Sequence, residues 1–220
     1  GSPDRSGVFS AGNGPAMRSA IIGAYFANDP ERLQSYVRAS TRLTHTDPKA
    51  EFGALAIARI AAWMVRSGGT RPTLSELEIL LCEITDDEEW LEIVSQTIRQ
   101  CEMGPPEPNT KGVSGYVYHT IPVAVAAWFT HPGDYRRTIE CAIRMGGDTD
   151  TVAAIAGSLA GIEVGAEGIP EPWIHGIADA PHGVKTIQKV ASDLAEESAS
   201  ESNYFPPLML LRNTGFTCVV

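Results

Sequence analysis

Two aspartates and a threonine before a helix are the residues best suited to chemistry. Residues 146–151 read Gly-Gly-Asp-Thr-Asp-Thr, and small residues follow them. In the turn before a helix, the carboxylates of Asp148 and Asp150 can converge, and Thr151 adds a hydroxyl. Such hard oxygen ligands suit Mg²⁺ or Ca²⁺, with water completing the coordination shell. An acidic helix N-cap would use the same residues, and the motif alone leaves both interpretations open.

A glycine-rich turn near the N-terminus could bind an anion. Residues 10–18 read Ser-Ala-Gly-Asn-Gly-Pro-Ala-Met-Arg, so this turn leads directly into a helix. Free backbone N–H groups at such a turn form a nest of the kind that holds phosphate. A plain helix start with Pro15 at the first helical position is the alternative.

A histidine stands at a corner between two predicted helices. The segment reads Thr44-His45-Thr46-Asp47-Pro48, and Asp47-Pro48 is a helix start signal. His45 could face a ligand from this corner, or it could simply be a polar residue beside a capping aspartate.

In this order along the chain, the three segments resemble the ADP-ribosylglycohydrolase family, metal-dependent hydrolases that remove ADP-ribose from modified residues. The resemblance covers roughly residues 8–175. Besides the glycine-rich loop and the Asp-x-Asp-Thr element, it rests on Leu43-Thr44-His45, Gly115-Tyr116-Val117, Thr120-Ile121-Pro122 and Ile169-Pro170-Glu171-Pro172-Trp173.

The resemblance implies a compact all-α fold around a centre of two Mg²⁺ ions. By the family pattern, the metal ligands in this chain are Asp148, Asp150 and Thr151. The residues that the pattern assigns to the substrate are Ser10, Ala11, Gly12, Asn13, Gly14, Met17, His45, Gly115 and Tyr116. The loop would hold the diphosphate and its ribose, and Tyr116 would offer an aromatic face.

The sequence departs from the family pattern at its start. The family carries a Thr-Asp-Asp-Thr element and an acidic residue before the glycine-rich loop, whereas this sequence begins only a few residues before it. We therefore expect the catalytic acid to lie upstream of Gly1, and only half of the magnesium ligands to be present. The missing segment would belong to another chain or lie outside these 220 residues; otherwise the chain is a fragment with impaired chemistry.

Two further segments bear on this departure. Residues 85–88, Thr-Asp-Asp-Glu, imitate the missing element but follow the loop, so we interpret them as the acidic first turn of a helix. His119 stands where an acidic residue is common in the family, and we assign it no role.

These expectations lead to one function and two alternatives. The first is a Mg²⁺-dependent hydrolase that removes ADP-ribose from modified protein side chains or related conjugates. The second is a module that binds ADP-ribose or a nucleotide without turnover, because the upstream ligands and acid are missing. The third is a helical domain without a ligand, which would make both motifs a coincidence.

The segments that carry these residues are predicted to be joined by helices throughout the chain. Apolar spacing and capping signals predict helices over residues 15–27, 30–43, 51–65, 73–84, 86–101, 116–129, 134–145, 151–164 and 183–197. Residues 102–114 are predicted to form a loop, and the chain is expected to turn near 169–173. Strands and helices do not alternate, so the predicted fold is an all-α, compact multi-helix array.

Composition sets the outer limits of these predictions. The 220 residues suit one domain, which we place at 8–197, after a linker or disordered start at 1–7 and before a polar linker and apolar tail at 198–220. A net charge of −10 argues against binding to nucleic acid. No apolar run is long enough to span a membrane. Four cysteines without a CxxC pair favour a reducing compartment, so we expect a cytoplasmic protein.

Overall fold

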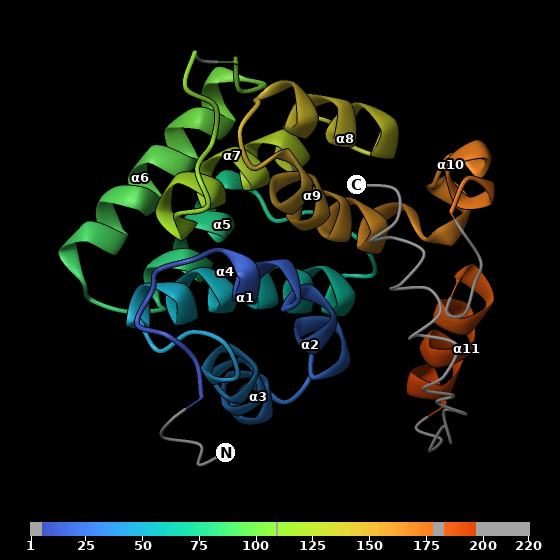
Figure 1. Cartoon of the computed structure of the whole chain (residues 1–220), viewed down its shortest axis with the longest axis horizontal. Helices are drawn as coiled ribbons and strands as arrows, with labels where there is room; N and C mark the ends of the chain where they lie inside the picture. The colour runs from blue at the N-terminus through green and yellow to red at the C-terminus, as the bar shows by residue number, and fades with distance from the viewer. Residues whose placement is uncertain (1–5, 109, 178–182, 197–220) are drawn as a thin grey trace, which may run out of the picture. The chain divides into compact units, whose positions relative to one another are not determined.

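Helices and turns make up the part of the chain that the computed structural model describes, which is residues 6–108, 110–177 and 183–196 (Figure 1). Within these ranges, β-pairing is confined to isolated bridges. The helices are α1 (Gly14–Met17), α2 (Ala20–Tyr25), α3 (Pro30–Arg42), α4 (Pro48–Arg66), α5 (Leu74–Cys82), α6 (Glu88–Met103), α7 (Val117–Phe129), α8 (Tyr135–Arg144), α9 (Thr149–Val164), the 3₁₀ helix η2 (Ala166–Gly168), α10 (Glu171–His175) and α11 (Val184–Ala195). The predicted all-α fold is confirmed.

The chain divides into two units, Gly1–Ile169 and Pro170–Val220. The first unit contains α1 to α9 and η2, and the second contains α10 and α11. The domain limits predicted from the sequence remain a prediction. Most of the predicted start at 1–7 and all of the predicted tail at 198–220 lie outside the described residues.

Helix α4 is the centre of the first unit. It packs against α1, α2, α3, α5, α7 and α9, and α1 and α2 can be seen alongside it in Figure 1. Its alanines make these close contacts feasible: Ala56, Ala58 and Ala61 are fully buried. Larger side chains, including those of Trp90, Trp128 and Tyr118, fill the space between the outer helices.

The single helix predicted over residues 15–27 is wrong, because the structure has two short helices there, α1 and α2. The break falls at Arg18 and Ser19, whose amides donate to the carbonyls of Pro15 and Ala16, three residues back. The Ser19 hydroxyl also donates to the Ala16 carbonyl at 2.9 Å. Such local side-chain hydrogen bonds compete with the regular helical ladder.

Aspartate and threonine caps begin most of the longer helices, as the sequence predicts. Thr73 and Glu76 form the expected capping box of α5. Asp87 accepts from the Trp90 amide at 2.9 Å, which confirms that residues 85–88 start a helix. Asp47 caps α4, so α4 begins at Pro48, earlier than the predicted residue 51.

The described residues also bear on the expectations drawn from composition. No helix among them is both long and apolar enough to cross a membrane. Cys82, Cys101 and Cys141 are free thiols, and the last two are buried. Burial raises the pKa of the Cys101 thiol to about 12, so this cysteine is a packed, unreactive side chain.

Candidate functional site

Isolated β-bridges bring together the distant segments that carry the predicted site residues. The bridged pairs are Val8 with His45, Gly12 with Tyr116, and Val113 with Gly147. The second bridge joins the glycine-rich loop to the start of α7 through the Asn13 amide, which donates to the Gly115 carbonyl at 3.0 Å. The third joins the segment before α7 to the turn before α9, where the Asp148 amide donates to the Val113 carbonyl at 2.8 Å.

Asn13 connects the two motifs that the sequence singles out. Its side chain is buried, with 7% of the residue exposed. The Nδ2 amide donates to Asp148 Oδ2 at 2.6 Å and to Thr120 Oγ1 at 2.9 Å. Thr151 Oγ1 donates to the other carboxylate oxygen, Asp148 Oδ1, at 3.0 Å. The Asp148 carboxylate therefore accepts a hydrogen bond on each oxygen. One donor is distant along the chain and the other is three residues away.

These hydrogen bonds keep Asp148 ionised. The Asn13 amide is the largest influence that lowers the pKa of Asp148 below its ordinary value, and it outweighs partial burial, which acts in the opposite direction. Asp150 and the Thr151 hydroxyl lower the pKa further. Asp148 is thus a carboxylate at neutral pH, which is the form that can bind a cation.

The donor set suits part of a coordination shell for a hard cation. Asp148 and Thr151 are in direct contact, and the exposed Asp150 accepts from the Thr151 amide at 2.9 Å. Two carboxylates and a hydroxyl match the preference of Mg²⁺ for oxygen, but they fill fewer positions than an octahedral ion requires. Across the described ranges, no group of three or more His, Cys, Asp or Glu side chains could hold a metal ion.

His45 lies directly over the glycine-rich loop. A Cβ atom at Gly12 would come within 2.5 Å of His45 Nε2, so a larger residue there would have to displace the ring. His45 Nδ1 shares a 2.8 Å hydrogen bond with the Thr44 hydroxyl. Partial burial, and then the positive charge of Arg18, lowers the pKa of His45. The imidazole is therefore mainly neutral at pH 7.

The backbone of the loop is less open than the predicted anion nest. The Asn13 amide is already bonded to the Gly115 carbonyl, and helix α1 is only four residues long. Gly115 lies close to the centre, because a Cβ atom there would come within 3.4 Å of Asp148 Oδ2. Ser10 and Met17 are exposed, and Met17 has 44% of its surface accessible, so their predicted roles remain predictions.

Two residues of the site were not predicted, although both lie in the quoted motifs. Thr120 receives the second hydrogen bond from Asn13. Arg18 donates to the Gly14 carbonyl at 3.1 Å and to Thr44 Oγ1 at 2.7 Å, and so ties the loop to the His45 corner.

Tyr116 is half-buried beside the loop, and its side chain is held by two residues that belong to none of the sequence motifs. Its phenol donates to Glu89 Oε1 at 2.7 Å, and Lys49 Nζ lies 3.3 Å from the phenol oxygen. The His119 ring is perpendicular to the Tyr116 ring, with centroids 5.0 Å apart, and shares a 2.8 Å hydrogen bond with the Ser114 hydroxyl.

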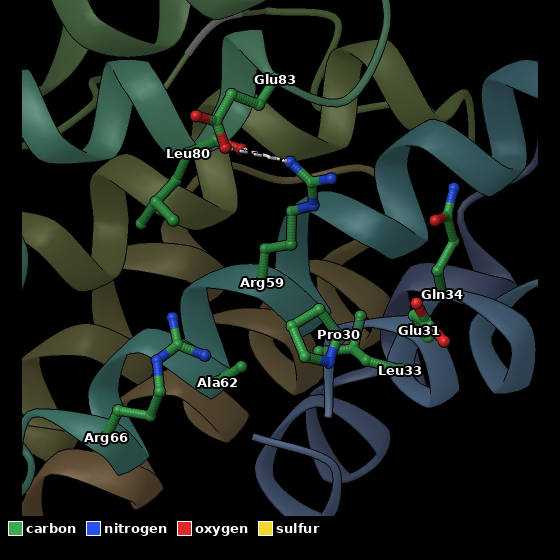
Figure 2. Close-up of a pocket in the computed structure, with 9 residues that line it drawn as sticks. All are labelled: Pro30, Glu31, Leu33, Gln34, Arg59, Ala62, Arg66, Leu80 and Glu83. Carbon is green, nitrogen blue, oxygen red and sulfur yellow. Dashed lines mark hydrogen bonds and ion pairs between the residues drawn. The ribbon is translucent and has the colours of Figure 1, made fainter. Parts of the chain in front are cut away.

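A separate pocket of about 280 Å³ lies between α3, α4 and the end of α5. Figure 2 shows Arg59 reaching across it toward Glu83, and the two charged groups are 3.8 Å apart. None of the predicted site residues lines this pocket, so it is distinct from the centre around Asp148.

Comparisons with known proteins agree with the motifs on which the site is built. A family model described as ADP-ribosylglycohydrolase matches residues 1–203. The ADP-ribosyl-[dinitrogen reductase] glycohydrolase of Rhodospirillum rubrum is 26% identical, over 74% of this chain and 50% of its own length. The ADP-ribosylhydrolase ARH3 of Mus musculus is 27% identical, over 76% of this chain and 53% of its own.

A solved structure, titled "ADP-ribosylglycohydrolase-related protein complex", is similar in fold. It superposes with a TM-score of 0.61 at 28% sequence identity, and covers 84% of this chain and 59% of its own. The chain thus spans about half the length of the two curated relatives named above.

Proposed function

The chain belongs to the ADP-ribosylglycohydrolase family, and from this premise we propose that it takes part in removing ADP-ribose from modified protein side chains or related conjugates. The reaction is the hydrolysis of the bond between the anomeric carbon of the ribose and its N- or O-linked substituent. Mg²⁺ is the proposed cofactor, and ADP-ribose or an ADP-ribosylated protein is the proposed ligand.

The observation that supports this proposal most strongly is the hydrogen-bonded group of Asn13, Asp148 and Thr151. The buried Asn13 amide donates to the Asp148 carboxylate and to the Thr120 hydroxyl, whereas a simple helix cap would bond to backbone amides. Asp148 instead makes no side-chain cap for α9. Its ionised oxygens are left facing Thr151 and Asn13, where Asp150 is also close.

Within this proposal, Asp148, Asp150 and Thr151 hold Mg²⁺. The bound ion would orient the ribose hydroxyls and activate a water molecule for attack on the anomeric carbon. Asn13 keeps the Asp148 carboxylate ionised and fixes its direction. In this proposal the loop around Gly12 and the neutral His45 ring would contact the phosphates and ribose, and Tyr116 would offer its ring.

Binding of ADP-ribose without turnover is the second candidate. It is favoured by the small donor set, because the described residues bring only two carboxylates and one hydroxyl to the centre. An octahedral Mg²⁺ ion held by so few protein ligands must rely on water or on further residues.

One experiment separates the two candidates. The chain is incubated with Mg²⁺ and an ADP-ribosylated protein, and free ADP-ribose is measured against a sample containing EDTA. Release that depends on Mg²⁺ supports the hydrolase. Absence of release, together with calorimetric binding of ADP-ribose, supports the binding module. Absence of both contradicts the proposed function.

A further inference from the structure

The phenol of Tyr116 is hydrogen-bonded to both members of an ion pair between two other helices. Lys49 lies in the first turn of α4, and Glu89 lies in the first turn of α6. Lys49 Nζ donates to Glu89 Oε2 at 2.6 Å, and Glu89 Oε1 accepts from the Tyr116 hydroxyl at 2.7 Å. Lys49 Nζ also donates to the phenol oxygen at 3.3 Å. The three groups form a closed ring of hydrogen bonds.

The same arrangement fixes the Tyr116 ring as well as its hydroxyl. The Lys49 ammonium lies 5.9 Å from the ring centroid, and the ring of Tyr118 lies 5.5 Å away. His119 approaches at 90° and 5.0 Å. The backbone of Tyr116 is held by its bridge to Gly12. Neither side-chain torsion of Tyr116 is therefore free to rotate without breaking these contacts.

Stability of the fold does not account for this network. The side chains of Glu89 and Lys49 are 53% and 33% exposed, and ion pairs in such positions contribute little to the free energy of folding. The hydrogen bonds do lower the pKa of Glu89 and raise that of Lys49, so both remain charged at neutral pH. What the network accomplishes is to hold one aromatic ring at the edge of the candidate site.

We propose that Lys49 and Glu89 are positioning residues, which hold the Tyr116 ring ready to stack on the base of a nucleotide ligand. Tyr116 directly follows Gly115, which lies against Asp148, and its backbone pairs with Gly12 of the glycine-rich loop. Aromatic rings stack on any base, because every base has a π face. A ring that is already fixed loses less conformational entropy on binding. This inference rests on the proposed function.

Calorimetry with ADP-ribose and with Mg²⁺ tests the inference on the full chain. Glu89→Ala and Lys49→Met are expected to weaken ADP-ribose binding by about three- to tenfold. Affinity for Mg²⁺ alone is expected to stay unchanged in both variants. Glu88→Ala, a neighbour in the same helical turn, is the matched control and should bind as the unaltered chain does.

A double-mutant cycle shows whether Glu89 acts through the phenol. Tyr116→Phe removes only the hydroxyl, so adding Glu89→Ala to it should cause little further loss of affinity. Full additivity of the two losses would overturn the inference, as would unchanged ADP-ribose affinity in Glu89→Ala. If the unaltered chain fails to bind ADP-ribose, the proposed function falls and the inference falls with it.

Discussion

Asn13 is the residue on which the candidate site depends most closely. It is a buried amide, and its two donor contacts join the glycine-rich loop to α7 and to the turn before α9. Because Asn13 is the largest influence on the pKa of Asp148, its replacement should change both the stability of the fold and the pH dependence of that stability.

For Asn13→Ala we expect a loss of about 2 kcal/mol in the free energy of unfolding at pH 7, the cost of leaving a carboxylate without its donor. The pKa of Asp148 is lowered in the folded state, so its contribution is present above the unfolded pKa. It is lost as the pH falls through the folded value. Urea denaturation at pH 7 and at a pH below the ordinary aspartate pKa of about 3.9 should therefore show a smaller difference at the lower pH. An equal difference at both pH values would contradict this assignment.

Substitution of Asp150 tests the proposed metal site without disturbing the core. Asp150 is exposed, and its side chain accepts a hydrogen bond from the local Thr151 amide. Asp150→Ala is expected to abolish Mg²⁺-dependent binding of ADP-ribose while the helical circular dichroism is retained. Asp86→Ala, in the segment that imitates the motif, is the control and should bind normally. Unchanged Mg²⁺ affinity in Asp150→Ala would rule out its role as a ligand.

The sequence predicts a contact between two site residues only where they are close along the chain. Asp148 and Thr151 are three residues apart at a helix start, so their contact follows from the motif. Lys49 and Glu89 reach Tyr116 across 67 and 27 residues, and no local pattern encodes that approach. Thr120 belongs to the same class, because its partner Asn13 is 107 residues away.

At the scale of elements, capping residues and apolar spacing predicted most helices to within a few residues. The break between α1 and α2 was missed, and so was the close approach of α2 to α4. Gly23 in α2 lies against the backbone of Ala58 in α4, and an added Cβ would overlap that backbone. A sequence pattern shows the apolar face of a helix, but it does not show how near the next helix comes.

The substitution Gly23→Ala tests how closely α2 packs against α4. Alanine favours helix by about 1 kcal/mol over glycine, yet the clash with a backbone cannot be relieved by a rotamer change. We expect a net loss of about 2 kcal/mol in unfolding free energy, measured by urea denaturation. Gly161→Ala in α9 is the control, since its Cβ would make an ordinary 4.0 Å contact with Tyr135. That variant should be as stable as the parent or more so.

At the scale of the first unit, one ion pair joins three distant segments. Arg71 donates to the carbonyls of Phe129 and His131 and pairs with Glu163 at 2.6 Å. Both side chains are largely buried, with 13% and 15% of their surfaces exposed. The Arg71 guanidinium also lies 4.9 Å from the ring centroid of Trp128. Because the ion pair is largely buried, removal of either charge leaves the other uncompensated.

Glu163→Ala is expected to cost about 3 kcal/mol of unfolding free energy, because it strands the Arg71 charge and the Gly133 amide. The midpoint of urea denaturation should fall accordingly. Glu92→Ala removes an exposed ion pair with Arg99 and should change the stability by less than about 1 kcal/mol. Similar losses in the two variants would show that burial of the Arg71–Glu163 pair is unimportant.

The hydrogen bond between Asn13 and Asp148 joins residues that are 135 positions apart, so it cannot form until most of the first unit has been synthesised. Proteins are synthesised from the N-terminus at about 5–20 residues per second. The glycine-rich loop therefore leaves the ribosome on the order of ten seconds before Asp148 exists. Helices α2 to α6 can pack during that interval, while Asn13 has neither Asp148 nor Thr120 to bond. The candidate site is consequently among the last parts of the first unit to be completed during synthesis.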